Sequence, residues 1–180
     1  MFLIHSPGDA KKLLNGLAQI LQNAIFPHLN SEIELERAVS LLIRDYTKHS
    51  LGLSEKELEG VIFAHGETKE EKTRWTDSKP MQNVHVFGCS NTSDIFLLHP
   101  AFQSIYVELK LSKQRGTLDS LPGDLQRAIG QSVIASLRHP YVICLVACDG
   151  ARKLNQADLG KELTKILWKN HHIALIVRSL

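Results

Sequence analysis

The sequence predicts an α/β fold in which helices flank a central mixed sheet of four to five strands, with extra helices at the N-terminus. Three observations lead to this class. Residues 105–111 alternate in side-chain character, as in a strand whose two faces differ. Residues 141–148 are nearly all apolar, as expected for a strand covered on both faces. Segments with apolar residues at helical spacing lie before and after these strands.

Length and composition fit one domain. The chain has 180 residues, of which 43% are apolar and 22% charged, as is ordinary for a globular protein. We expect a single domain over residues 1–180, with residues 1–30 as an N-terminal helical extension and residues 31–180 as the core. The chain has no apolar run long enough for a bilayer, and residues 1–4 lack the features of a signal peptide, so we expect a cytoplasmic location and no membrane.

Charge and cysteine content exclude several classes of protein. The net charge is only +2, so a DNA-binding surface has to be a local patch rather than a property of the whole chain. Three cysteines without paired spacing argue against a disulfide framework and against a zinc site.

Two helices are expected before the sheet. Residues 13–25 have helical periodicity and suit packing or a dimer surface. A second helix begins after Ser31, where Ser31-x-x-Glu34 predicts a capping box. Glu32 lies in the first turn, where negative charge suits the helix dipole. Glu36 has no such local role, and it borders the apolar stripe.

The next segments are less regular. Residues 54–63 predict a short helix. Residues 65–83 are polar and poor in aliphatic side chains, which indicates a mobile or inserted loop, with contact to substrate as one option. Trp75 in this loop is expected to plug the core, with stacking on a base as the alternative. Residues 84–87 predict the first strand of the sheet.

The main functional signal is a pair of strands with three charged residues. Asp94 opens a strand, and a short turn joins it to the strand of residues 105–111, so the two are antiparallel neighbours. Glu108 and Lys110 share one face of the second strand, roughly 7 Å apart at the backbone. Unpaired buried charge costs several kcal/mol, so these residues need a reason to be there. We expect Asp94, Glu108 and Lys110 to meet at one end of the sheet.

The remaining elements alternate helix and strand. They are a helix at 124–138, a strand at 141–148, a helix at 154–168 and a strand at 173–177. The expected buried face of the first helix is Leu125, Ala128, Ile129, Val133 and Leu137. Arg127, Gln131 and Arg138 fall together on its polar edge.

Asp94, Glu108 and Lys110, with this order of elements, resemble the PD-(D/E)xK nuclease superfamily, which implies a restriction-endonuclease-like core. The proline of the motif is missing, since Ser93 precedes Asp94. Gln131 matches a helix glutamine that faces the active site in the RecB-like and junction-resolvase-like branch.

The resemblance implies a site that hydrolyses DNA phosphodiester bonds with Mg²⁺ or Mn²⁺. Asp94 and Glu108 are hard oxygen ligands, and the carbonyl of Leu109 could add a third. A glutamate from the helix before the sheet often joins the metal in the superfamily, and Glu36 is the candidate, with Glu32 second. Lys110 would activate water or stabilise charge on the phosphate.

The resemblance also implies a surface for DNA. Gln131 would orient water or phosphate as a fourth catalytic residue. The candidate phosphate contacts are Lys113, Arg115, Arg127 and Arg138. A homodimer or a partner subunit is left open.

Two functions remain in competition. The first is a metal-dependent DNA nuclease, and the second is a non-catalytic nucleic-acid-binding or assembly subunit on the same fold. The complete set of Asp94, Glu108 and Lys110 favours the first. Structural roles stay open for individual residues: Glu108 and Lys110 could form an ion pair, and Glu36 could be a surface residue that pairs with Arg37 or Lys48.

Overall fold

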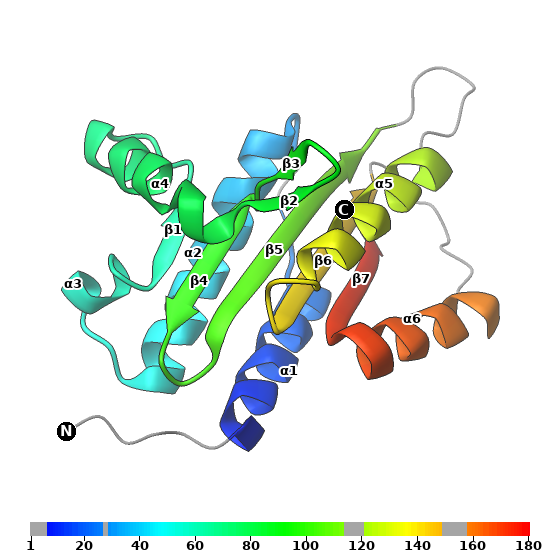
Figure 1. The fold of residues 1–180 in the computed structure, drawn as a ribbon, viewed down its shortest axis with the longest axis horizontal. Helices are drawn as coiled ribbons and strands as arrows, with labels where there is room; N and C mark the ends of the chain where they lie inside the picture. The colour runs from blue at the N-terminus through cyan, green and yellow to red at the C-terminus, as the bar shows by residue number, and fades with distance from the viewer. Residues whose placement is uncertain (1–6, 27–28, 114–120, 149–157) are drawn as a thin grey trace.

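Five strands form one mixed sheet (Figure 1). The structure, a computed structural model, describes residues 7–26, 29–113, 121–148 and 158–180. In spatial order the strands are β1 (Ile62–Ala64), β4 (Ile95–His99), β5 (Gln103–Ser112), β6 (Tyr141–Cys148) and β7 (Ile173–Ser179). The pairs β1–β4 and β4–β5 are antiparallel, whereas β5–β6 and β6–β7 are parallel.

Helices cover both faces of the sheet. Helices α1 (Pro7–Asn23) and α2 (Glu32–Leu51) lie behind the sheet in Figure 1, and α5 (Leu121–Ala135) and α6 (Asp158–His171) pack on the other side. The short helix α3 (Glu55–Leu58) and helix α4 (Lys69–Gln82) flank the β1 edge, next to a separate hairpin of β2 (Val84–Val86) and β3 (Cys89–Asn91). The expected α/β class with a mixed, helix-flanked sheet is confirmed.

Each face of the sheet has its own apolar core. The α1/α2 face includes Leu14, Leu17, Leu21, Leu35, Val39, Ile43, Ile95, Leu97, Ile105, Val107, Leu109, Ile143 and Leu145. The α5/α6 face includes Tyr106, Ala128, Ala135, Val142, Cys144, Val146, Leu167 and Ile173. Every residue of β6 is buried, which confirms the expectation for a strand covered on both faces. Helix α1 belongs to the same core as α2.

The start of α2 follows the predicted cap with one difference. The Ser31 hydroxyl accepts from the Glu34 amide at 3.2 Å, as expected for an N-cap. The Glu34 carboxylate accepts instead from the amide of Asn30, at 2.6 Å, so the reciprocal half of the capping box is displaced by one residue. The first turn of α2 also contains Glu32, whose carboxylate contacts the end of β5.

The region before the sheet differs from the sequence expectation. Helix α3 ends at Leu58, and residues 62–64 form the edge strand β1 rather than the end of a helix. Most of residues 65–83 form helix α4 rather than a loop, with Thr68 and Glu71 in a complete capping box. The sequence did not predict this helix because its buried positions include the polar Ser78 and Gln82, so it has no apolar stripe.

Trp75 is buried in α4, in agreement with the expectation that it plugs the core. The polar side chains around it are satisfied by a network, in which Ser93 donates to Gln82 at 2.8 Å. The expectation that residues 84–87 open the main sheet is wrong. They lie in the two-stranded β2–β3 hairpin, where Val86 pairs with Cys89 across a tight turn.

Helix α5 is shorter at its C-terminal end than expected. It ends at Ala135, so Leu137 is 70% exposed rather than part of the buried face. Ala128, Ser132 and Ala135 are its buried residues. Among the residues described, no helix is both long and apolar enough to cross a membrane.

The hairpin turn gives a prediction about stability. Phe87 and Gly88 both have positive φ, at 49° and 80°, and Phe87 is fully exposed at 102%. A left-handed conformation costs an L-residue about 1–2 kcal/mol, and asparagine tolerates it best. We expect Phe87→Asn to raise the free energy of unfolding by about 1 kcal/mol in urea titrations. Phe87→Ala, which keeps the strain, is the matched control, and equal stability of the two variants would contradict this explanation.

Candidate functional site

Asp94 and Glu108 face each other across the β4–β5 pair. The register pairs Ile95 with Val107, so the residue before β4 lies opposite Glu108. The Asp94 amide donates to the Val107 carbonyl at 3.0 Å, and Asp94 Oδ2 accepts from the Leu109 amide at 2.6 Å. The tight turn between the strands therefore brings the two carboxyl groups together, as the sequence predicted.

Burial raises the pKa of both carboxyl groups. Glu108 is only 4% exposed. This burial, together with the charge of Asp94, raises the pKa of Glu108 to about 8. Burial also raises the pKa of Asp94, to about 6, and the negative charges of Glu36 and Glu32 raise it further. The hydrogen bond from the Leu109 amide acts in the opposite direction and lowers this pKa. At neutral pH this pair therefore favours keeping a proton or acquiring a cation.

Tyr106 lies beneath Glu108 on the same face. Its hydroxyl donates to Glu108 Oε2 at 3.5 Å, and burial followed by the charge of Glu108 raises the pKa of this phenol. The ring of His139 stacks on Tyr106 with centroids 5.4 Å apart, and His139 is itself held by the Ser104 hydroxyl at 3.0 Å. Glu108 therefore lies next to a pair of packed aromatic rings, Tyr106 and His139.

The charge of Lys110 lowers the pKa of both carboxyl groups, and its ammonium is fixed by Glu32 of α2. Its ammonium lies 3.0 Å from Glu32 Oε1, which also accepts weakly from the Leu111 amide at 3.4 Å. Burial disfavours the charged ammonium, but the hydrogen bond and charge of Glu32 outweigh it, and Glu108 and Asp94 add to the effect, so the pKa of Lys110 is raised. Lys110 therefore stays charged at neutral pH.

Glu36 is buried rather than at the surface, and its charge acts on Asp94. The alternative in which it pairs with Arg37 or Lys48 is wrong. Both carboxylate oxygens of Glu36 face His65, which contacts them through its amide at 2.9 Å and through Nδ1 at 2.9 and 3.0 Å. The His65 ring packs on Trp75 with centroids 4.4 Å apart. These contacts leave further lone pairs on the Glu36 carboxylate, and its role as a metal ligand stays a prediction.

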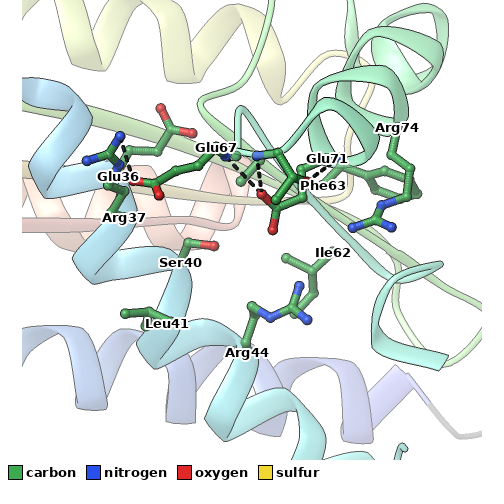
Figure 2. A pocket seen from close by; sticks show the side chains of 13 residues that line it. Glu36, Arg37, Ser40, Leu41, Arg44, Ile62, Phe63, Glu67, Glu71 and Arg74 are labelled. Carbon is green, nitrogen blue, oxygen red and sulfur yellow. Dashed lines mark hydrogen bonds and ion pairs between the residues drawn. The ribbon is translucent and has the colours of Figure 1, made fainter. Parts of the chain in front are cut away.

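A pocket opens on the other side of Glu36, between α2 and the segment that leads into α4 (Figure 2). Its volume is about 510 Å³. It is lined by Glu36, Arg37, Ser40, Leu41, Arg44, Ile62, Phe63, Ala64, Gly66, Glu67, Thr68, Glu71 and Arg74. Glu36 lines the pocket, and its charge also raises the pKa of Asp94, so Glu36 links the pocket to the carboxyl pair.

Gln131 is held by the β2–β3 hairpin. Its Nε2 donates to Asn91 Oδ1 at 3.3 Å, and its carbonyl accepts from Asn91 Nδ2 at 3.0 Å. In the part of the chain that the structure describes, no hydrogen bond links it to Glu108 or Lys110. Its expected place beside these residues stays a prediction.

Two of the predicted phosphate contacts bind backbone carbonyls of the chain itself. The Lys113 ammonium donates to the Asn30 carbonyl, and Arg138 donates to the carbonyls of Asn83 and Pro80, so both side chains hold parts of the fold together. Arg127 is exposed on α5. Arg115 lies outside the described residues.

The two carboxyl groups fit a divalent ion with few protein ligands. Among the described residues, no three His, Cys, Asp or Glu side chains are grouped so as to hold a metal. Mg²⁺ is commonly bound by one or two carboxylates, with water and phosphate oxygens completing its shell. Asp94 and Glu108 match this donor set, and their raised pKa values favour a positive charge between them. The Leu109 amide supports Asp94, and its carbonyl as a ligand stays a prediction.

Sequence reasoning missed His65 and the partner of Lys110. His65 falls in a segment that was expected to be a loop, yet a histidine directly after a short apolar run, Val61 to Ala64, was a usable signal for a strand end. Glu32 was expected to act chiefly on the helix dipole, and only the packing of α2 against β5 brings it to Lys110.

Comparison of the chain with protein-family models, with curated proteins and with solved structures gives no match. What the site can do therefore follows from its own residues.

Proposed function

We propose that this chain is a metal-dependent nuclease that hydrolyses DNA phosphodiester bonds. The observation that supports this most is the pair of carboxyl groups, Asp94 and Glu108, whose pKa values are raised to about 6 and about 8 beside a charged lysine. Two carboxyl groups that repel each other in a buried place destabilise the metal-free protein. A divalent cation would relieve that repulsion and supply the chemistry.

The chemistry divides between the ion and the chain. Mg²⁺ or Mn²⁺ on Asp94 and Glu108 would polarise the scissile phosphate and lower the pKa of bound water. Lys110, kept charged by Glu32, stabilises negative charge on the phosphate or orients the attacking water. Tyr106 and the Leu109 amide hold the two carboxylates in place.

The fold class is part of the proposal. A sheet with antiparallel strands on one side, parallel strands on the other, and a helix α2 that brings Glu32 against β5 is compatible with a restriction-endonuclease-like core. The position of Glu36 on that helix, near Asp94, supports the same affiliation. The proposed class is the PD-(D/E)xK nucleases.

One observation favours the alternative, a non-catalytic nucleic-acid-binding or assembly subunit. Lys110 has a good ion-pair partner in Glu32, and Glu36 has one in His65, so both residues have structural roles that need no metal. Under this alternative the chain would bind DNA without cutting it.

Titration with Mn²⁺ tests the metal site. We expect wild-type protein to bind Mn²⁺ in isothermal titration and Asp94→Asn to lose at least about tenfold in affinity, because one charged ligand is replaced by a neutral one that retains the acceptor for the Leu109 amide. Asp45→Asn, at a site exposed on α2, is the matched control. Equal affinity of Asp94→Asn and wild type would exclude Asp94 as a ligand. Plasmid nicking with Mg²⁺, with and without EDTA, then separates the nuclease from the binding subunit.

A further inference from the structure

The pocket beside Glu36 has an apolar floor and charged walls. Ile62 and Ala64, which share one face of β1, form the floor, and Leu41 of α2 adds an exposed apolar edge. Figure 2 shows Arg44 and Arg74 extending toward this floor from two different helices. The volume of about 510 Å³ lies within the range of small-molecule sites, about 300–1,000 Å³.

The acids that line the pocket are already neutralised by donors. Glu36 is bound by the amide and ring of His65. Glu67 pairs with Arg37 at 2.7 Å. The Glu71 carboxylate accepts from two backbone amides at the start of α4, at 2.8 and 3.0 Å, and these hydrogen bonds lower its pKa. These three carboxylates therefore repel an entering anion less than their number suggests.

The two arginines that flank the floor are less firmly engaged. The Arg44 guanidinium lies 3.8 Å from Glu55, whose carboxylate has a closer partner in Lys48. Arg74 lies 3.1 Å from Glu59. The side chains of Glu55 and Glu59 are 67% and 49% exposed, and ion pairs at such exposed positions are weak and easily exchanged. Both guanidinium groups are thus available to a ligand.

We propose that this pocket binds one unpaired nucleotide of the DNA strand whose phosphate is cut at Asp94 and Glu108. The base would lie on the aliphatic floor of Ile62 and Ala64, and a phosphate would contact Arg44 and Arg74. A flat, partly apolar ligand with one anionic group matches a floor of this kind between two guanidinium groups. The proposal rests on the proposed nuclease function and adds that the substrate is single-stranded at or next to the cut.

Binding of matched oligonucleotides tests this inference. Fluorescence anisotropy would compare a labelled single-stranded oligodeoxynucleotide with a blunt duplex of the same length, in EDTA so that nothing is cut. We expect Arg44→Gln/Arg74→Gln to bind the single strand at least about tenfold more weakly, with a salt slope lower by about 0.7 for each phosphate that is no longer neutralised. The duplex is expected to change less.

The control variant removes two positive charges at a site away from the pocket. Lys165→Gln/Lys169→Gln alters two exposed positions on α6, far along the chain from the pocket, and should bind the single strand within about twofold of wild type. An equal decrease in affinity in both double variants, or none in the pocket variant, would overturn the proposal.

A second measurement uses only wild-type protein, so it does not depend on whether a variant folds. Thymidine monophosphate should displace the labelled single strand from wild-type protein better than thymidine or inorganic phosphate, because only the nucleotide uses both the floor and the arginines. Equal competition by inorganic phosphate would indicate a simple anion site and overturn the inference.

The two proposals fail separately. If the Arg44→Gln/Arg74→Gln variant binds the single strand as wild type does, and wild type nicks plasmid with Mg²⁺, the nucleotide pocket is refuted and the nuclease proposal stands. If the variant binds the single strand more weakly but wild type does not cleave DNA, the nuclease proposal is refuted and the nucleotide pocket stands.

Discussion

Glu108→Gln should abolish metal-dependent cleavage of DNA and at the same time make the metal-free protein more stable. Glutamine fills the same space without a charge, so it removes a metal ligand and the repulsion with Asp94 together. A fall in cleavage rate of at least about a hundredfold is expected, in line with the removal of one group that stabilises charge in a transition state. A residue whose neutralisation abolishes activity and raises stability has a functional rather than a structural purpose.

The gain in stability should depend on pH. Both carboxyl groups have a folded pKa above the ordinary values of 3.8 and 4.5, so the folded protein binds protons more tightly than the unfolded chain. The stability that comes from this binding is fully present below about pH 4 and is lost as the pH rises through about 6 and about 8. For one proton the slope reaches about 1.4 kcal/mol per pH unit.

Urea unfolding in EDTA between pH 5 and pH 9 measures this effect. Wild type should lose stability across that range, and Glu108→Gln should lose less, so the difference between them grows as the pH rises. Glu162→Gln, at an exposed position on α6, serves as the control and should follow wild type. Parallel curves for wild type and Glu108→Gln would mean that Glu108 titrates normally, and would remove the main support for a cation site.

Lys110→Ala should separate catalysis from binding. If the ammonium acts in the chemical step, its removal should slow cleavage by about 10²–10⁴-fold, the usual contribution of a positioned proton-transfer group. DNA affinity should fall only modestly, with a change in salt slope of about one unit, as for one phosphate contact. Mn²⁺ affinity should not fall, because the variant leaves Asp94 and Glu108 in place and removes a competing positive charge.

Nicking assays and anisotropy on the same preparations provide the measurement. Lys165→Ala, whose side chain is exposed on α6 and pairs with Glu162, controls for the removal of a lysine. Full cleavage by Lys110→Ala would show that the lysine serves only its ion pair with Glu32. The non-catalytic alternative would then gain support if wild type also bound DNA without cutting it.

The sequence predicted best where a pattern was local. The Ser31 cap, the β4–β5 turn and the apolar run of β6 are each visible within a few residues, and all three occur in the structure. Strand β1 was missed because three residues give no alternation to detect. Helix α4 was missed because burial of Ser78 and Gln82 depends on a hydrogen-bond network that forms only in the folded protein.

The candidate site shows the same division. Asp94, Glu108 and Lys110 could be grouped from sequence because one turn and one strand face fix their relation. The contact of Glu32 with Lys110 and that of His65 with Glu36 join residues far apart in the chain, and only tertiary packing creates them. Sequence patterns of period two and 3.6 contain no information on such pairs.

The short β4–β5 turn also bears on the order of folding. The hairpin closes a small loop, whose entropic cost is low, so Asp94 and Glu108 meet early. Glu32 reaches Lys110 only when α2 docks on β5, a contact across a long stretch of chain that is expected to form late. The nascent hairpin therefore brings its mutually repelling acids together before the helix that fixes the neighbouring lysine has arrived, and protons or divalent ions in the surrounding solution are the first partners available to them.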